Sequence, residues 1–214
     1  MVLLTGAIGS GKTTACLGVV ALCRAQGIPV GGLLSLAVRD AAGQRVAIQV
    51  EDLATGRQRI LARVGEGAGD RIGSYVFSGD AVAWALDALR ARRDADGLLV
   101  VDEVGPLELW EGKGLAPALT DLRHRAERGG PLLVVVREGL VGSFLGTMVP
   151  IHRPIHIFRV ALHTRDDLPR RIFGALGLGH AQAARARNPL GPGTSKQVHE
   201  AGKEPFGAGR PAVA

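Results

Sequence analysis

The sequence predicts an α/β fold, in which a mostly parallel sheet is covered by helices on both faces and carries an antiparallel β-meander at one edge. Continuous apolar segments at 97–101 and 132–136 alternate with amphipathic helical segments, which is typical of parallel strands buried on both faces. Short segments of β-type sequence between residues 33 and 64 predict the meander.

The first element is a short strand that leads directly into a phosphate-binding loop. Residues 2–4 (VLL) are apolar, and Gly6–Thr13 (GAIGSGKT) fit the pattern G-x-x-x-x-G-K-[ST]. The next apolar residues have the spacing of one helix face: Cys16, Val19, Val20 and Cys23. Strand, loop and helix therefore follow in the order that a P-loop requires.

This loop predicts a site for a nucleoside triphosphate bound together with Mg²⁺. Its glycines let successive N–H groups turn toward a phosphate, and the following helix directs its positive end to the same place. Lys12 is expected to reach the β- and γ-phosphates, and Thr13 is expected to ligate Mg²⁺. The candidate nucleotide-binding residues here are Gly6, Ala7, Ile8, Gly9, Ser10, Gly11, Lys12, Thr13 and Thr14.

An antiparallel meander is expected after the first helix. Residues 27–32 (GIPVGG) break the helical pattern, and β-type segments follow at 33–38, 45–51 and 58–64 with turn residues between them. Hairpins do not fit the middle of a parallel sheet, so we expect the meander at one edge. The glycine-rich residues 65–73 are expected to form a loop.

A helix is predicted next, from Ser78 as its N-cap to Arg93, and the buried strand 97–101 follows it. A second amphipathic helix is predicted on an apolar face that includes Leu122, and it ends before Pro131. The strand 132–136 comes directly after that helix. Helices therefore alternate with buried strands through this half of the chain.

The predicted domain covers residues 1–178. Its last elements are a strand at 155–160 and a short helix beyond Thr164, with Pro169 in the first turn, where a missing N–H is harmless. Residues 179–214 are rich in Gly, Pro, Ala and Arg and lack periodicity, so we expect a disordered tail.

Two acidic residues follow the strand 97–101. In an open α/β sheet, ligands bind beyond the carboxyl ends of the strands, so Asp102 and Glu103 are expected to face the nucleotide. Asp102 is the candidate Mg²⁺ ligand, directly or through water. Glu103 points elsewhere and is the candidate group that orients a water for attack on the γ-phosphate or accepts its proton. A solvated charge that caps a loop is the alternative for Glu103.

The order of the strands predicts a third catalytic candidate. Proteins with an Asp-Glu pair at this place commonly insert another strand between the loop strand and the aspartate strand, as in the RecA-like topology. The segment 132–136 is the natural candidate for that strand, and Arg137 would then end beside the γ-phosphate. Arg137 would stabilise charge that grows during phosphoryl transfer, unless it is an ordinary surface residue.

The chain resembles the cancer-related and thermophile nucleoside-triphosphatase family over nearly all of residues 1–178. The most specific segment is 100–109 (VVDEVGPLEL), and the others are the phosphate loop, 32–39, 52–56, 72–76 and 164–169. The resemblance implies a RecA-like P-loop fold and Mg²⁺-dependent hydrolysis of nucleoside triphosphates with loose base preference. It also implies nucleotide contacts by Val100, Val101, Asp102, Glu103, Val104 and Gly105. The long tail and residues 34–36 depart from the family pattern.

Composition disfavours nucleic acid as a partner. The net charge is +6, and residues 181–214 contain five basic and two acidic residues, so half of the excess lies in the expected tail. Aromatic residues make up 4% of the chain and offer few platforms on which bases stack. We also expect no membrane partner and a cytoplasmic protein, because no apolar segment reaches about 20 residues and no signal peptide precedes the loop.

The leading functional hypothesis is an enzyme that hydrolyses ATP, GTP and other nucleoside triphosphates with Mg²⁺. A small-molecule or nucleotide kinase is an alternative, although a water-orienting Glu103 is of little use to an enzyme that excludes water. A nucleotide-dependent switch that binds a protein or RNA partner is a third. Trp84 and Trp110 are interpreted as packing residues, and Arg39 as a group that could approach a phosphate from the meander.

Overall fold

The computed structural model describes residues 1–161 and 166–178 of the chain. Its strands are β1 (Val2–Thr5), β2 (Val30–Arg39), β3 (Arg45–Asp52), β4 (Gln58–Val64), β5 (Arg71–Ile72), β6 (Tyr75–Phe77), β7 (Leu98–Val104), β8 (Leu132–Val136) and β9 (His156–Arg159). Its helices are α1 (Lys12–Ala25), α2 (Gly79–Arg90), α3 (Pro106–Leu109), the 3₁₀ helix η1 (Ala116–Ala118), α4 (Leu119–Glu127), α5 (Val141–Thr147) and α6 (Leu168–Ala175). The expected tail and Thr164 lie outside the described residues.

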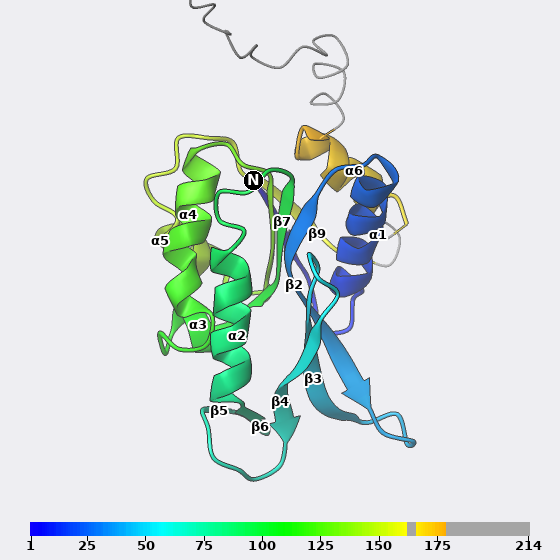
Figure 1. Cartoon of the computed structure of the whole chain (residues 1–214), viewed down its shortest axis with the longest axis vertical. Coiled ribbons are helices and arrows are strands. Elements are labelled where there is room, and N and C mark those ends of the chain that lie inside the picture. Colours follow the sequence, from blue (N-terminus) through cyan, green and yellow to red (C-terminus); the bar gives the residue numbers. More distant parts are fainter. Residues whose placement is uncertain (162–165, 179–214) are drawn as a thin grey trace, which may run out of the picture.

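One sheet runs through the whole described fold, in the order β5-β6-β4-β3-β2-β7-β8-β1-β9 (Figure 1). The pairs from β2 to β9 are parallel, and those from β2 to β5 are antiparallel. β8 lies between β1 and β7, which confirms that a strand is inserted between the loop strand and the aspartate strand. The predicted fold class, with its meander at one edge, is confirmed.

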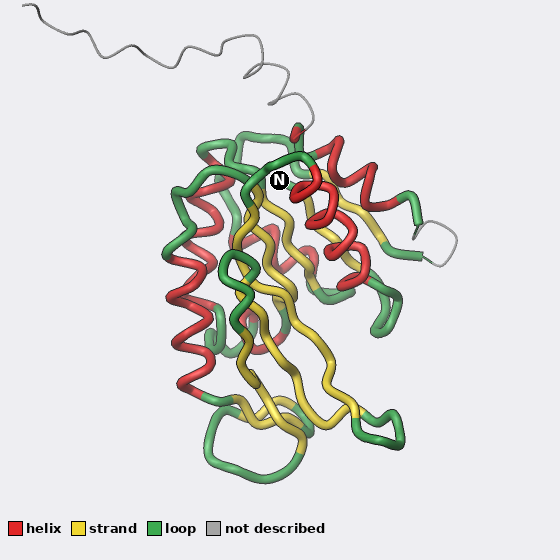
Figure 2. The backbone as a smooth tube through the Cα atoms, turned by 45° about the vertical axis from the view of Figure 1, so that its right-hand side comes forward, coloured by secondary structure: helices red, strands yellow, loops and turns green. Residues whose placement is uncertain are grey.

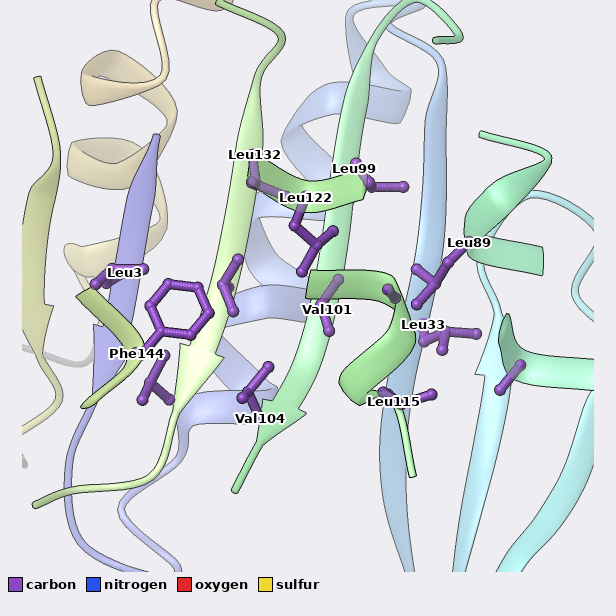
Figure 3. Packing of buried hydrophobic residues seen from close by; sticks show 14 of the residues in the cluster. Leu3, Leu33, Leu89, Leu99, Val101, Val104, Leu115, Leu122, Leu132 and Phe144 are labelled. Carbon is purple, nitrogen blue, oxygen red and sulfur yellow. The ribbon is translucent and has the colours of Figure 1, made fainter. Parts of the chain in front are cut away.

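Helices cover both faces of the parallel strands. Because successive side chains point to opposite faces, side chains are buried on both of them. Leu3 of β1 belongs to a core under α2, α4 and α5, whereas Val2 and Leu4 pack under α1 and α6. Figure 3 shows Leu122 and Phe144 from the helices lying over the strands in the first core. This division explains why the strands read as unbroken apolar segments in the sequence.

β2 joins the parallel sheet to the meander. Val30 to Leu33 pair in parallel with β7, and Leu33 to Arg39 pair antiparallel with β3, so this one long strand runs through both parts of the sheet (Figure 2). The prediction that the strand begins at Leu33 is therefore wrong, because Gly31 and Gly32 lie inside it. A Cβ on Gly32 would lie 1.9 Å from the carbonyl oxygen of Val100, so glycine permits the close approach of two strands.

Several predicted elements differ from the structure in extent. The glycine-rich segment 65–73 ends in a strand, and β5 and β6 form a hairpin that pairs with β4. The helix predicted to contain Leu122 is divided into η1 and α4, and neither α3 nor α5 was predicted. Two-residue strands and short helices have too little sequence to show a period.

The helix ends agree better with the sequence. Ser78 is the N-cap of α2, and its hydroxyl accepts a hydrogen bond from the N–H of Ala81 at 3.3 Å, although the helix ends at Arg90 rather than Arg93. α6 has Pro169 in its first turn, as predicted. Within the described residues, no helix combines the length and the apolar character that crossing a membrane requires.

Gly32→Ala is expected to destabilise the fold much more than Gly43→Ala. Both glycines have positive φ, at 100° and 78°, so alanine is strained at either position by about 1–2 kcal/mol. A Cβ on Gly43 meets nothing within 4 Å, whereas one on Gly32 collides with the backbone of β7. We expect a loss of about 3 kcal/mol or more for Gly32→Ala in urea denaturation. Equal losses in the two variants would contradict the close-approach argument.

Candidate functional site

The phosphate loop connects β1 to α1 at the carboxyl edge of the sheet. Gly6, Gly9 and Gly11 have φ of 145°, 78° and 99°, which other residues rarely adopt. Gly11 is the N-cap of α1, and the first turn of that helix carries no acidic residue. The N–H groups at this helix end are therefore directed toward the loop and suit an anion.

Lys12 folds back over the loop that contains it. Its Nζ donates hydrogen bonds to the carbonyl oxygens of Gly6 at 3.0 Å and Ala7 at 3.1 Å. The residue is 8% exposed, and Nζ lies 3.9 Å from Oε2 of Glu103. The ammonium group is thus held where the loop meets the end of β7.

Asp102 is fixed to the loop and to the meander at once. The hydroxyl of Thr13 donates to Oδ2 of Asp102 at 2.8 Å, and the hydroxyl of Ser35 donates to the Asp102 carbonyl. The residue is 3% exposed, and this burial is the main reason that its pKa is raised to about 7. The charge of Glu103 acts in the same direction, while the hydrogen bond from Thr13 opposes it. A cation beside this carboxyl would favour its charged form.

Glu103 lies between two cationic side chains. Its Oε1 accepts hydrogen bonds from Nε and Nη2 of Arg137 at 3.2 and 3.0 Å, and its Oε2 faces Lys12. Arg137 follows β8 directly, so the inserted strand carries it to the end of the neighbouring β7. The three candidate catalytic residues of the sequence are therefore brought together.

A cavity of 630 Å³, the site cavity, extends from the loop toward the meander. Its lining includes Lys12, Thr13, Asp102, Glu103 and Arg137. Of the remaining nucleotide-binding candidates, Ile8, Gly9, Gly11, Thr14 and Gly105 also line it. Another cavity, 790 Å³ in volume and more open, lies near His152 and contains none of the candidate residues.

Some candidates do not reach the site cavity with their side chains. Val100, Val101 and Val104 are buried in the two cores of the sheet, so a contact with nucleotide stays a prediction for them. Gly6, Ala7 and Ser10 belong to the loop but do not line the cavity, and the Ser10 hydroxyl is buried with no hydrogen-bond partner among the described residues. They shape the loop whose inner residues line the cavity.

Glu108 supports the segment that follows Glu103. Its carboxylate accepts the N–H of Gly105 at 2.9 Å and the N–H of Leu115 at 3.2 Å, and the residue is 8% exposed. Burial raises the pKa of Glu108, and these N–H groups oppose the shift. The sequence did not reveal that Glu108 holds residues 105 and 115 together.

The two tryptophans differ from each other. Trp84 packs at the edge of the first core, and the guanidinium of Arg59 lies 5.3 Å from the centre of its ring. Trp110 is 69% exposed, so its interpretation as a packing residue is wrong. Arg39 lines the site cavity, where its Nη1 donates to the carbonyl of Gly43 at 2.5 Å.

A family model described as NTPase matches residues 1–173. The chain belongs to the NTPase family. The nucleoside-triphosphatase THEP1 of Thermofilum pendens is 37% identical over 174 residues, which cover 79% of this chain and 91% of that protein. The protein of the same name from Methanopyrus kandleri is 33% identical over 173 residues, covering 80% and 92%. These matches confirm the family predicted from the sequence.

The fold also resembles a solved structure. The crystal structure of THEP1 from the hyperthermophile Aquifex aeolicus superimposes with a TM-score of 0.64 and 18% identity, covering 82% of this chain and 99% of that one. At this identity the likeness concerns the fold. It agrees with a P-loop protein that has parallel central strands and antiparallel strands at one edge.

Glu108→Gln is expected to lower the free energy of unfolding by about 1–3 kcal/mol. An amide has one accepting oxygen, so one of the two backbone N–H groups held by the carboxylate would lose its partner. Urea denaturation measures the change. Glu111→Gln is the control, because the side chain of Glu111 is 39% exposed and should shift stability by less than about 0.5 kcal/mol. Similar values for both variants would contradict a supporting role for Glu108.

Proposed function

We propose that the site hydrolyses nucleoside triphosphates, including ATP and GTP, to nucleoside diphosphate and phosphate, with Mg²⁺ and with loose base preference. The observation that carries the proposal is the position of Glu103, whose carboxylate lies between Lys12 and Arg137 at the phosphate loop. Membership of the NTPase family supports the same reaction.

The loop and Lys12 would hold the phosphates. The backbone N–H groups at the start of α1 suit the phosphate oxygens, and Lys12 would exchange the carbonyls of Gly6 and Ala7 for the β- and γ-phosphates. Because Lys12 is already confined beside the loop, little side-chain freedom is lost when the triphosphate binds.

Thr13 and Asp102 would hold Mg²⁺. A hydroxyl and a carboxylate are the hard oxygen ligands that Mg²⁺ prefers, and in such sites the remaining ligands are phosphate oxygens and water. These two side chains are hydrogen-bonded to each other, so both are aimed at one point beside the loop. The residues present therefore fit the ion. Bound Mg²⁺ would neutralise negative charge on the β- and γ-phosphates.

Glu103 and Arg137 would act on the reacting end of the triphosphate. When phosphate draws the two cations away, the carboxylate of Glu103 is released to orient a water or to accept its proton. Arg137 would then face the γ-phosphate and stabilise the charge that grows on it during transfer. One ion pair in the free protein thus keeps both groups at the place where they act.

Glu103→Gln is expected to lower kcat by about 10²- to 10⁴-fold and to leave nucleotide affinity nearly unchanged. The amide retains the size of the side chain but accepts no proton. Phosphate release from ATP and fluorescence titration with a nucleotide analogue measure the two effects. Glu138→Gln is the matched control, because Glu138 pairs with Arg159 outside the site cavity. Full activity in Glu103→Gln would remove Glu103 from the mechanism.

Lys12→Ala is expected to weaken nucleotide binding by about 10- to 150-fold, since a charge-assisted hydrogen bond contributes about 1.5–3 kcal/mol, and to lower turnover as well. Calorimetric titration measures the affinity. Lys113→Ala is the control, because Lys113 is half exposed and pairs with Asp70. Assays of the wild type with ATP, GTP, CTP and UTP side by side test the base preference, and rates that differ by more than about a hundredfold would contradict it.

A further inference from the structure

The site cavity extends well beyond the phosphate loop. It measures 630 Å³, within the range of pockets that hold small organic molecules, and its lining reaches from the loop to the meander and α2. Away from the loop, one part of its wall is apolar, beside polar residues such as Ser35, Ser74 and Tyr75. We call this part the inner compartment, and it is lined by Ile48, Val50, Leu61, Phe77, Val82 and Leu115.

The inner compartment lies beyond the carboxylates as seen from the loop. In the sheet, β7 with Asp102 and Glu103 is placed between β1, which leads into the loop, and β2 and β3, which face the compartment. In the nucleotide site proposed above, the γ-phosphate is the end of the triphosphate that reaches Glu103. A molecule in the compartment would therefore lie next to the γ-phosphate.

A pair of arginines gives the compartment a charged border. Arg39 and Arg45 are opposite each other in the register of β2 and β3, and both line the site cavity. Like charges at directly opposed positions of an antiparallel pair repel each other. An anionic group placed between the two guanidinium groups would remove this repulsion and would be held by charge-assisted hydrogen bonds.

We propose that the inner compartment binds an organic phosphoryl acceptor, a small molecule with an apolar body, an anionic group and a hydroxyl, and that the site transfers the γ-phosphoryl group to it. The apolar body packs against Val50, Leu61 and Val82, the anionic group lies at Arg39 and Arg45, and the hydroxyl faces Glu103. This inference rests on the nucleotide site proposed above. Hydrolysis is then the reaction that occurs when water takes the place of the hydroxyl.

The transfer balances in atoms and electrons. The hydroxyl oxygen forms a bond to the γ-phosphorus, and the bond from that phosphorus to the oxygen that bridges to the β-phosphate breaks. The hydroxyl proton passes to the carboxylate of Glu103. The products are a phosphate monoester and the nucleoside diphosphate.

The test follows the γ-phosphate of ATP. The full chain is incubated with γ-labelled ATP, Mg²⁺ and the small-molecule fraction of a cell extract, freed of protein by ultrafiltration. Chromatography then separates label in organic products from label in inorganic phosphate. With the wild type we expect a labelled organic monoester. With Val82→Phe, which fills the compartment, we expect the ratio of organic to inorganic label to fall by a factor of about ten or more.

Matched variants separate the compartment from general effects. Val46→Phe adds the same ring on an exposed part of β3 outside the cavity and should keep the wild-type ratio. Arg39→Ala and Arg45→Ala should each lower the ratio, whereas Arg63→Ala on β4 should not. The arginine variants change exposed residues, so they decide the question if Val82→Phe does not fold.

Two results would overturn the inference. If the wild type released all of the label as inorganic phosphate, no organic acceptor would have been phosphorylated. The inference would then fail, while the proposed hydrolysis would stand. An organic product whose yield is the same in Val82→Phe and in both arginine variants would place the acceptor elsewhere. If neither phosphate nor organic product forms, the proposed hydrolysis fails as well, and that outcome is distinct from the first two.

Discussion

The hydrogen bond from Thr13 to Asp102 is the interaction on which the site depends. It joins residues 89 positions apart, so it fixes the phosphate loop against the end of the aspartate strand. The hydroxyl of Ser35 holds the carbonyl of the same aspartate, which attaches the meander to the same point. Asp102 is buried, and these two hydrogen bonds connect three parts of the chain at it: the loop, the end of β7 and the meander.

Much of this arrangement follows from the sequence. The phosphate loop lies between an apolar strand and an amphipathic helix, and that context makes the motif specific. The position of β8 followed from the Asp-Glu pair, and it correctly placed Arg137 at the end of the strand beside β7. Long elements with a clear period are predictable because their pattern repeats several times along the chain.

Other features depend on tertiary contacts that no local pattern contains. Gly32 was placed before the strand, but it lies inside β2, where the Val100 carbonyl occupies the space that a side chain would need. The pairing of Glu103 with Arg137 requires the neighbouring ends of β7 and β8, and the inner compartment requires residues of α2 and of the meander to lie side by side. Trp110 was interpreted as a packing residue from its residue type, and the type of one residue does not determine its exposure.

The shared strand β2 has a consequence for how this architecture can vary in evolution. Its first residues belong to the parallel sheet and its last residues to the meander, without an interruption between them. The meander is therefore not a separate module. Removing it, or grafting it onto another protein, would also take away a strand of the parallel sheet. Diversification is easiest at its distal turns, where length and composition are free to drift while the carboxylates stay in place.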